Sequence, residues 1–282
     1  MEKMLIMDKI NLGIYEKALP NRLDINEKLK LAKKIGFNQL EISIDESDEK
    51  LNRLTNGFSK KLLKAQIDND MRVRTMCLSG HRKYPFGSND EKIRKKSLDI
   101  MQKALEFADI NSIKIIQLAG YDVYYEKSNE KTKKYFIENL FKAVDFASKY
   151  GVILAFETME TEFMDTVEKA MEYVNLVDSP YLGIYPDIGN LKNASVKYNK
   201  DVVEDIKKGK GHIFAAHLKE TNPGIYRDMQ FGSGGHTEYE RCIKELKNQK
   251  VQIYTGEFWD HGEENYKEII KNSYEFLSEK LK

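Results

Sequence analysis

The chain has 282 residues, 41% of them hydrophobic and 32% charged, and its 46 Lys and Arg against 45 Asp and Glu leave a net charge of +1. This balance argues against a protein that binds nucleic acid through a strongly basic surface. No apolar run approaches the roughly 20 residues of a membrane span. We therefore expect one domain over residues 1–282 that can bury a sizeable core, with neither nucleic acid nor membrane as a partner.

Cysteine usage and the N-terminus bear on location. Cys77 and Cys242 lie far apart and form no CxxC motif, which indicates a reducing compartment. The apolar stretch within residues 1–9 is too short for a signal peptide. Together these features predict a cytoplasmic protein.

In chain order, strand-like apolar runs alternate with helical patterns eight times. The strands are predicted at 11–15, 39–43, 73–79, 113–119, 151–157, 182–187, 213–217 and 252–257. The helices are predicted at 26–35, 59–70, 90–109, 130–150, 165–177, 201–208, 237–247 and 263–281. This alternation predicts a parallel sheet of the α/β class, and eight regular units in one chain favour a closed (β/α)8 TIM barrel over a doubly wound open sheet.

The last four predicted strands each end in an ionisable residue: Glu157, Asp187, His217 and Glu257. Consecutive parallel strands are usually neighbours, so these ends should line one arc of the barrel mouth, where such folds bind ligands. Three carboxylates and one imidazole suit one divalent metal ion, Zn²⁺ or Mn²⁺ better than Mg²⁺. The alternative is four unrelated polar strand ends, but burying three carboxylates side by side without a cation is costly.

A glycine-rich loop follows the seventh predicted strand, just before a helix, and contains Ser233, Gly234 and Gly235. Backbone N–H groups in such a loop can approach an anion, and barrels often bind phosphate after strands seven and eight. Arg227, just upstream, could pair with the phosphate through two hydrogen bonds. The loop is therefore a candidate phosphate site, and a flexible turn is the alternative.

Five segments of the chain resemble a known family. They read MCLSGHRKYPFGS from Met76, ETMETEFMDT from Glu157, YPDIGN from Tyr185, AAHLKETNPG from Ala215 and TGEFW from Thr255. Nearly end to end, the chain resembles the L-ribulose-5-phosphate (L-xylulose-5-phosphate) 3-epimerases of the xylose-isomerase-like barrel superfamily. The four strand-end residues are shared across that superfamily, whereas segments 77–88 and 217–235 are similar to its sugar-phosphate epimerase branch.

The resemblance implies a reaction and residue roles. A 3-epimerase removes the C3 proton of a small ketose phosphate and returns it to the other face, through an enediolate that the metal holds. Glu157 and Glu257 would each be both metal ligand and acid/base, and Asp187 and His217 would be ligands alone. His81 and Arg82, in the loop after the third strand, would face the substrate, although a solvated basic loop is the alternative. A homodimer is also implied.

Three other functions remain open. A sugar-phosphate aldose–ketose isomerase or a hexulose-phosphate isomerase would use the same metal site but move a different proton. A non-catalytic sugar-phosphate binding protein would not need a carboxylate on each side of its ligand. An abasic-site endonuclease of the superfamily needs more histidine ligands, and of five histidines only His217 stands at a strand end.

Overall fold

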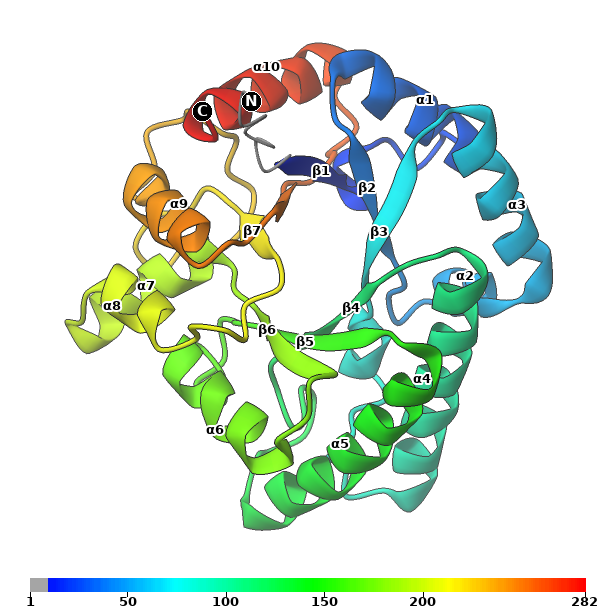
Figure 1. The fold of residues 1–282 in the computed structure, drawn as a ribbon, viewed down its shortest axis with the longest axis vertical. Helices are drawn as coiled ribbons and strands as arrows, with labels where there is room; N and C mark the ends of the chain where they lie inside the picture. Colours follow the sequence, from blue (N-terminus) through cyan, green and yellow to red (C-terminus); the bar gives the residue numbers. More distant parts are fainter. Residues whose placement is uncertain (1–9) are drawn as a thin grey trace, which may run out of the picture.

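Eight parallel strands form a barrel with helices around it, seen down its axis in Figure 1. The computed structural model describes residues 10–282; residues 1–9, where the signal-peptide prediction falls, lie outside the described residues. The strands are β1 (Asn11–Tyr15), β2 (Gln39–Ser43), β3 (Arg72–Cys77), β4 (Ile115–Ala119), β5 (Ile153–Glu157), β6 (Leu182–Tyr185), β7 (Ala216–Leu218) and β8 (Ile253–Gly256). The predicted (β/α)8 barrel is confirmed.

The helices follow the predicted order, with two additions, a single turn at Asp48–Leu51 and a longer helix at Ile188–Tyr198. They are α1 (Ile25–Ile35), α2 (Asp48–Leu51), α3 (Asn56–Asp68), α4 (Glu91–Ile110), α5 (Glu130–Tyr150), α6 (Val167–Val177), α7 (Ile188–Tyr198), α8 (Val202–Lys207), α9 (Tyr239–Asn248) and α10 (Tyr266–Lys280), with short 3-10 turns at Glu16–Ala18, Asn52–Leu54 and Ser79–Arg82. Helix α7 was not predicted. It begins directly after Asp187, which caps it by accepting the N–H of Asn190.

The barrel closes between β6 and β7, where pairing is reduced to isolated bridges. Ile184 pairs with Ile213, and Asp187 pairs with His217, whose N–H donates to the Pro186 carbonyl at 2.9 Å. Backbone pairing between these two segments therefore holds Asp187 beside His217.

The strands alternate between two environments, as strands buried on both faces require. On β2, Leu40 and Ile42 join the large apolar core between the strands and the helices, whereas Glu41 points into the barrel toward side chains of β3, β6 and β7. Polar groups can occupy the interior only if they are paired. The interior near the strand ends is therefore a place for specific polar contacts.

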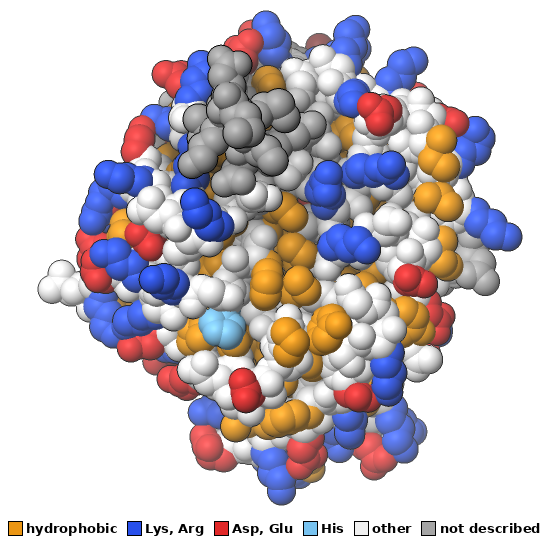
Figure 2. All heavy atoms as spheres, viewed as in Figure 1, with side chains coloured by type: hydrophobic (Ala, Val, Ile, Leu, Met, Phe, Trp, Pro, Cys, Tyr) orange, Lys and Arg blue, Asp and Glu red, His pale blue; other side chains and the backbone are white. Residues whose placement is uncertain are grey.

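The surface agrees with the balanced composition. In Figure 2, Lys and Arg side chains alternate with Asp and Glu over the outer helices, and hydrophobic side chains gather near the centre of that face. Side chains fill the middle of such barrels, so the centre is a packed core and not a pore. In residues 10–282, no helix combines the length and apolar character needed to cross a membrane.

Candidate metal centre

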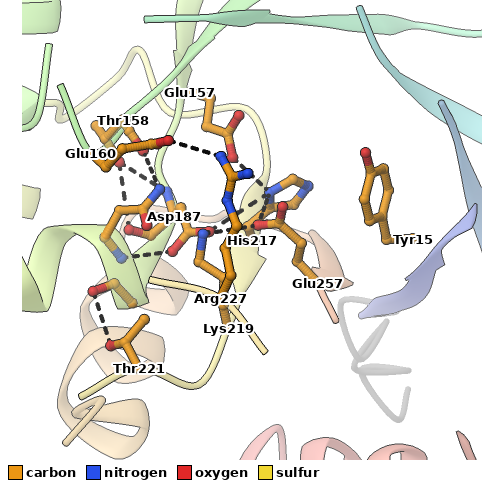
Figure 3. A network of polar contacts seen from close by, with 12 residues as sticks. Tyr15, Glu157, Thr158, Glu160, Asp187, His217, Lys219, Thr221, Arg227 and Glu257 are labelled. Carbon is orange, nitrogen blue, oxygen red and sulfur yellow. Dashed lines mark hydrogen bonds and ion pairs between the residues drawn. The ribbon is translucent and has the colours of Figure 1, made fainter. Parts of the chain in front are cut away.

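Four side chains converge at the C-terminal ends of β5 to β8: Glu157, Asp187, His217 and Glu257 (Figure 3). Glu157 is the last residue of β5, and Glu257 directly follows β8. His217 lies in the middle of β7 and not at its end as predicted, because β7 runs from Ala216 to Leu218. One ligand atom from each of the four residues lies within 4.8 Å of the others.

His217 stands at the centre of the cluster. Its Nδ1 lies 3.2 Å from Glu157 Oε1, 3.1 Å from Glu257 Oε2 and 3.9 Å from Asp187 Oδ2. Its Nε2 points the other way, to Glu41 Oε1 at 2.6 Å. Nδ1 of the imidazole therefore faces the three carboxylates of the cluster, and Nε2 is hydrogen-bonded to Glu41 on the opposite side of the ring.

The two carboxylate oxygens of Asp187 make different contacts. Oδ1 accepts the N–H of Asn190 at 2.8 Å, at the start of α7. Oδ2 faces the cluster, 2.8 Å from the Lys219 ammonium. The backbone N–H of Asp187 donates to Oγ1 of Thr158, the first residue after β5. These contacts fix the carboxylate in one orientation, so Asp187 is suited to be a metal ligand with a fixed position.

The pKa values of neighbouring groups in the cluster are shifted in opposite directions, because burial and the surrounding charges act on each group differently. Burial, and then the charge of Glu257, raises the pKa of Glu157 above 4.5, and burial raises that of Asp187. Burial opposes ionisation of Glu257 as well, but Lys219 and His217 lower its pKa. Burial disfavours the imidazolium of His217, yet Glu41 and Glu257 raise its pKa well above 6.5. Such divergent shifts at neighbouring groups are typical of functional sites.

The donor set fits a divalent cation. Three carboxylates and one imidazole are buried together with Lys219 as the nearby ammonium. Asp187 Oδ2 and Glu257 Oε2 are buried oxygens that accept no well-directed hydrogen bond from residues 10–282. The Lys219 ammonium lies beside both oxygens but is shared between them, and a divalent cation would offset the remaining cost of burying the carboxylates together. Hard and borderline divalent ions take this mixture of oxygen and nitrogen ligands.

A cavity of about 60 Å³ opens above the cluster. Glu157 and Glu257 line it, with 8% and 10% of their side-chain surface exposed, whereas Asp187 and His217 are fully buried. Of the four residues, only the two glutamates can therefore touch a molecule in the cavity.

Cationic side chains form much of the rest of the cavity wall: Lys17, Arg82, Lys219 and Arg227. Arg227, after β7, reaches across to Glu160, after β5, with 2.8 Å between Nη2 and Oε1 (Figure 3). This ion pair joins two loops above the metal ligands. Both residues of the pair line the cavity together with Glu157 and Glu257.

The predicted substrate residues divide between two places. Arg82 and Arg227 line the cavity. The ring of His81 is buried beneath the loop, with Nε2 3.2 Å from the Ser97 carbonyl on α4 and the ring packed against Phe86. Burial lowers the pKa of His81 to about 4, so its imidazole is neutral at pH 7. Within residues 10–282, the wall of the cavity is formed without His81.

The glycine-rich loop surrounds a carboxylate of the protein itself. Glu220 Oε1 accepts the backbone N–H of Thr221 at 3.3 Å, and the side chain of Glu220 fills the space beside Gly235, where an added Cβ would clash with Oε1. Ser233 and Gly234 are exposed at the tip of the loop. The Glu220 side chain therefore occupies the inner side of the loop, and phosphate binding by Ser233, Gly234 and Gly235 stays a prediction.

Two residues at the centre were not predicted. Lys219 lies within a segment that carries the family resemblance, and its Nζ is 2.8 Å from Asp187 and 3.3 Å from Glu257. Glu41 lies on β2, a strand from which no ligand was predicted. Glu41 could have been identified as a candidate because it is an acidic residue in the middle of a predicted strand, and the structure shows that this strand is buried along its whole length.

Comparisons with known proteins agree with this geometry. The family model described as Xylose isomerase-like TIM barrel matches residues 29–280. L-ribulose-5-phosphate 3-epimerase UlaE of Shigella boydii serotype 18 is 40% identical over 271 residues, which cover 95% of this chain and 94% of that protein. The fold is similar to that of a D-tagatose 3-epimerase-like protein, with a TM-score of 0.78, 18% identity and coverage of 96% of this chain and 97% of that one.

A D-psicose 3-epimerase, solved in the presence of D-fructose, has a TM-score of 0.79 and 14% identity, and the match covers 96% of this chain and 99% of that one. At such identities the solved structures establish the fold alone, whereas the match to the curated epimerase extends over nearly the whole of both chains. The chain therefore belongs to the xylose isomerase-like TIM barrel family and, within it, to the L-ribulose-5-phosphate 3-epimerases.

Proposed function

We propose that this protein is a metal-dependent 3-epimerase that interconverts L-ribulose 5-phosphate and L-xylulose 5-phosphate. The observation that carries the proposal is that, of the four residues of the candidate metal centre, only Glu157 and Glu257 reach the cavity. Inverting one carbon by proton transfer needs a base on each face of that carbon, and this centre offers two carboxylates to the ligand. The curated relative of the same length is named for this reaction.

The two glutamates exchange roles with the direction of the reaction. One carboxylate takes the C3 proton of the ketose, and the electron pair of the broken C–H bond moves toward the C2 carbonyl. The other carboxylic acid returns a proton to the opposite face of C3, and the carbonyl is restored. Glu157 comes from β5 and Glu257 from β8, so the two carboxylates approach the cavity from different sides of the barrel mouth.

Glu157, Asp187, His217 and Glu257 would hold the metal, and Zn²⁺ or Mn²⁺ suits this donor set better than Mg²⁺. When bound, the ion acts as a Lewis acid that makes the proton next to the carbonyl more acidic. The buried pair Asp187 and His217 would then fix its position, and the Lys219 ammonium would add positive charge beside the reacting atoms.

The cationic wall suits the phosphate. Arg82 is the candidate contact, because its buried Nε donates no hydrogen bond within residues 10–282 and its guanidinium stacks over Tyr124 at 4.8 Å. The Arg227–Glu160 ion pair joins two loops that line the cavity, and we infer that it separates when substrate binds. Ser233, Gly234 and Gly235 stay a prediction for phosphate contact, as does His81 for substrate contact.

Arg82→Met should raise KM for the phosphorylated ketose by about tenfold to a hundredfold, the value of one lost charge-assisted hydrogen bond. KM for the same ketose without phosphate should change little. Arg22→Met is the matched control, because Arg22 also stacks on a tyrosine, Tyr266 at 4.8 Å, but does not line the cavity. A KM that rises equally for both ketoses would contradict a phosphate contact.

Metal removal tests the proposed function itself. Protein stripped by a chelator should not interconvert the two pentulose phosphates, and adding Zn²⁺ or Mn²⁺ should restore turnover. Proton NMR of the product distinguishes the alternatives: conversion to an aldose phosphate would indicate an isomerase, and binding without conversion would indicate a sugar-phosphate binding protein. Full activity in stripped protein would refute the metal-dependent mechanism.

The two cysteines bear on the cellular compartment of the protein. Cys77 and Cys242 are buried free thiols, which suits a reducing compartment, and we propose the cytoplasm. A homodimer stays a prediction from the family resemblance.

A further inference from the structure

Glu41 is a buried carboxylate in the barrel interior, beneath the candidate metal centre. It lies at the middle of β2 and has no exposed surface. Its Oε1 is 2.6 Å from His217 Nε2, and its Oε2 accepts hydrogen bonds from Thr75 Oγ1 at 2.7 Å and Tyr185 Oη at 2.9 Å. Three strands other than its own, β3, β6 and β7, supply these partners. The carboxylate is therefore held in one place and aimed at one nitrogen of the imidazole.

The charge of Glu41 needs this contact. A buried carboxylate without a cationic or strongly polarised partner costs several kcal/mol. Thr75 and Tyr185 offer hydroxyls, and His217 is the one partner in the described part of the chain that makes a hydrogen bond or ion pair with Glu41 and can carry a positive charge. At 2.6 Å the contact has the length of a strong, charge-assisted hydrogen bond. The pair is therefore a fixed structural unit that spans the barrel from β2 to β7.

A second polar group, Gln117, also contacts the imidazole but cannot choose between its nitrogens. Gln117 Nε2 lies 3.2 Å from Nδ1 and 3.4 Å from Nε2, nearly equidistant from the two. Glu41 touches Nε2 alone, and Nδ1 faces the three carboxylates of the candidate centre. A hydrogen on Nε2 leaves the Nδ1 lone pair free for a metal. Of these two neighbours, only Glu41 can select that tautomer.

We propose that Glu41 is a positioning residue of the metal centre: it accepts the Nε2 hydrogen of His217 and thereby presents Nδ1 as the metal-binding nitrogen. The inference rests on the proposed metal-dependent function. Glu41 does not line the cavity, so it acts through His217 and not on the substrate. Metal-bound histidines commonly need such a partner behind the ring, which fixes its orientation and increases its basicity.

The test is the metal affinity of Glu41→Gln, which keeps the shape of the side chain and removes its charge. Competition with a chromophoric chelator should show Zn²⁺ and Mn²⁺ binding weakened by about tenfold to a hundredfold. Thr255→Val is the matched control, because the buried Thr255 pairs with His217 through the β7–β8 backbone and its hydroxyl contacts Tyr185 at 2.9 Å, but within residues 10–282 that hydroxyl forms no hydrogen bond with Glu41 or His217. Its metal affinity should stay close to that of the unaltered protein.

Nitrogen-15 NMR of the histidine side chains reports which imidazole nitrogen carries the hydrogen, a property that a loss of packing alone would not change. With five histidines in the chain, the His217 signals can be assigned by their loss in His217→Gln. In the unaltered protein Nε2 should carry the hydrogen and Nδ1 should shift on metal addition. In Glu41→Gln this preference should weaken. If Glu41→Gln does not fold, Tyr185→Phe, which removes one hydrogen bond to Oε2, should weaken metal binding severalfold.

Unchanged metal affinity in Glu41→Gln, or an equal loss in Thr255→Val, would overturn the inference and leave the proposed function standing. Metal affinity that depends on Glu41 in a protein without epimerase activity would support the inference and refute the proposed function. A protein that binds neither metal would refute both.

Discussion

Glu157→Gln and Glu257→Gln should each lower kcat for epimerisation by about 10³-fold or more, while the barrel remains folded. A positioned general base contributes about 10²- to 10⁴-fold, and each glutamate is also a candidate metal ligand. Glutamine has the shape of glutamate but cannot take or return the proton. The measurement is kcat for both substrate epimers at saturating metal, with circular dichroism to confirm the fold.

Loss of metal binding has to be separated from loss of a base. Asp187→Asn is the matched control, because Asp187 belongs to the same cluster but is fully buried away from the cavity. Each glutamine variant should still exchange the C3 proton of one epimer with solvent, and a different epimer for each variant, because one base remains. Asp187→Asn should show no such preference. If either glutamine variant converts one epimer to the other at an appreciable rate, the two-base mechanism is wrong.

Glu16→Gln should destabilise the protein by about 3–5 kcal/mol, as expected when one member of a buried ionic cluster is removed. Glu16 has no exposed surface and contacts three cations: Lys28 at 3.1 Å, Lys50 at 2.9 Å and Arg53 at 2.7 Å. It also accepts the backbone N–H of Ser43 at the end of β2. A neutral amide at this position would leave three buried or partly buried cations without a counter-charge. The urea midpoint of unfolding at pH 7 measures the effect.

The pH dependence has a defined sign. Burial raises the pKa of Glu16, but the three cations outweigh it and hold the pKa far below 4.5 in the folded protein. A carboxylate with a lowered pKa stabilises the fold above its unfolded pKa, and this stabilisation is lost as pH falls toward the folded pKa. The stability difference between the unaltered protein and Glu16→Gln should therefore shrink as pH falls below about 4.

Glu275→Gln is the control for Glu16→Gln, because Glu275 forms an exposed pair with Lys271 at 3.5 Å on α10. Such pairs contribute at most about 1 kcal/mol. If Glu16→Gln were no more destabilising than Glu275→Gln, the cluster would not support the loops after β1 and β2.

The barrel and the four metal-centre residues were accessible from the sequence for a physical reason. Parallel strands buried on both faces appear as continuous apolar runs, and a charged residue that ends such a run marks the edge where ligands bind. The eight predicted strands overlap β1 to β8. Glu157, Asp187, His217 and Glu257 therefore appeared as one pattern, and the structure brings their ligand atoms together.

Contacts between distant strands were not accessible in the same way. Glu41 meets His217 across the barrel, 176 residues away in the chain, and nothing local in β2 identifies that partner. Helix α7 was missed because it starts directly after Asp187 and carries Gly189 and Asn190 in its first turn, both weak helix formers. The glycine-rich loop predicted a phosphate site, and no local pattern indicated that the side chain of Glu220 packs against the inner side of that loop.

The central claim is proton exchange at C3 by two bases in a metal-loaded site. The most direct measurement is turnover of L-ribulose 5-phosphate in D₂O by metal-loaded protein, with NMR to locate the deuterium. The account predicts that the L-xylulose 5-phosphate formed carries deuterium at C3 and hydrogen at every other carbon-bound position. Deuterium at C1, or a product formed without any deuterium, would contradict it.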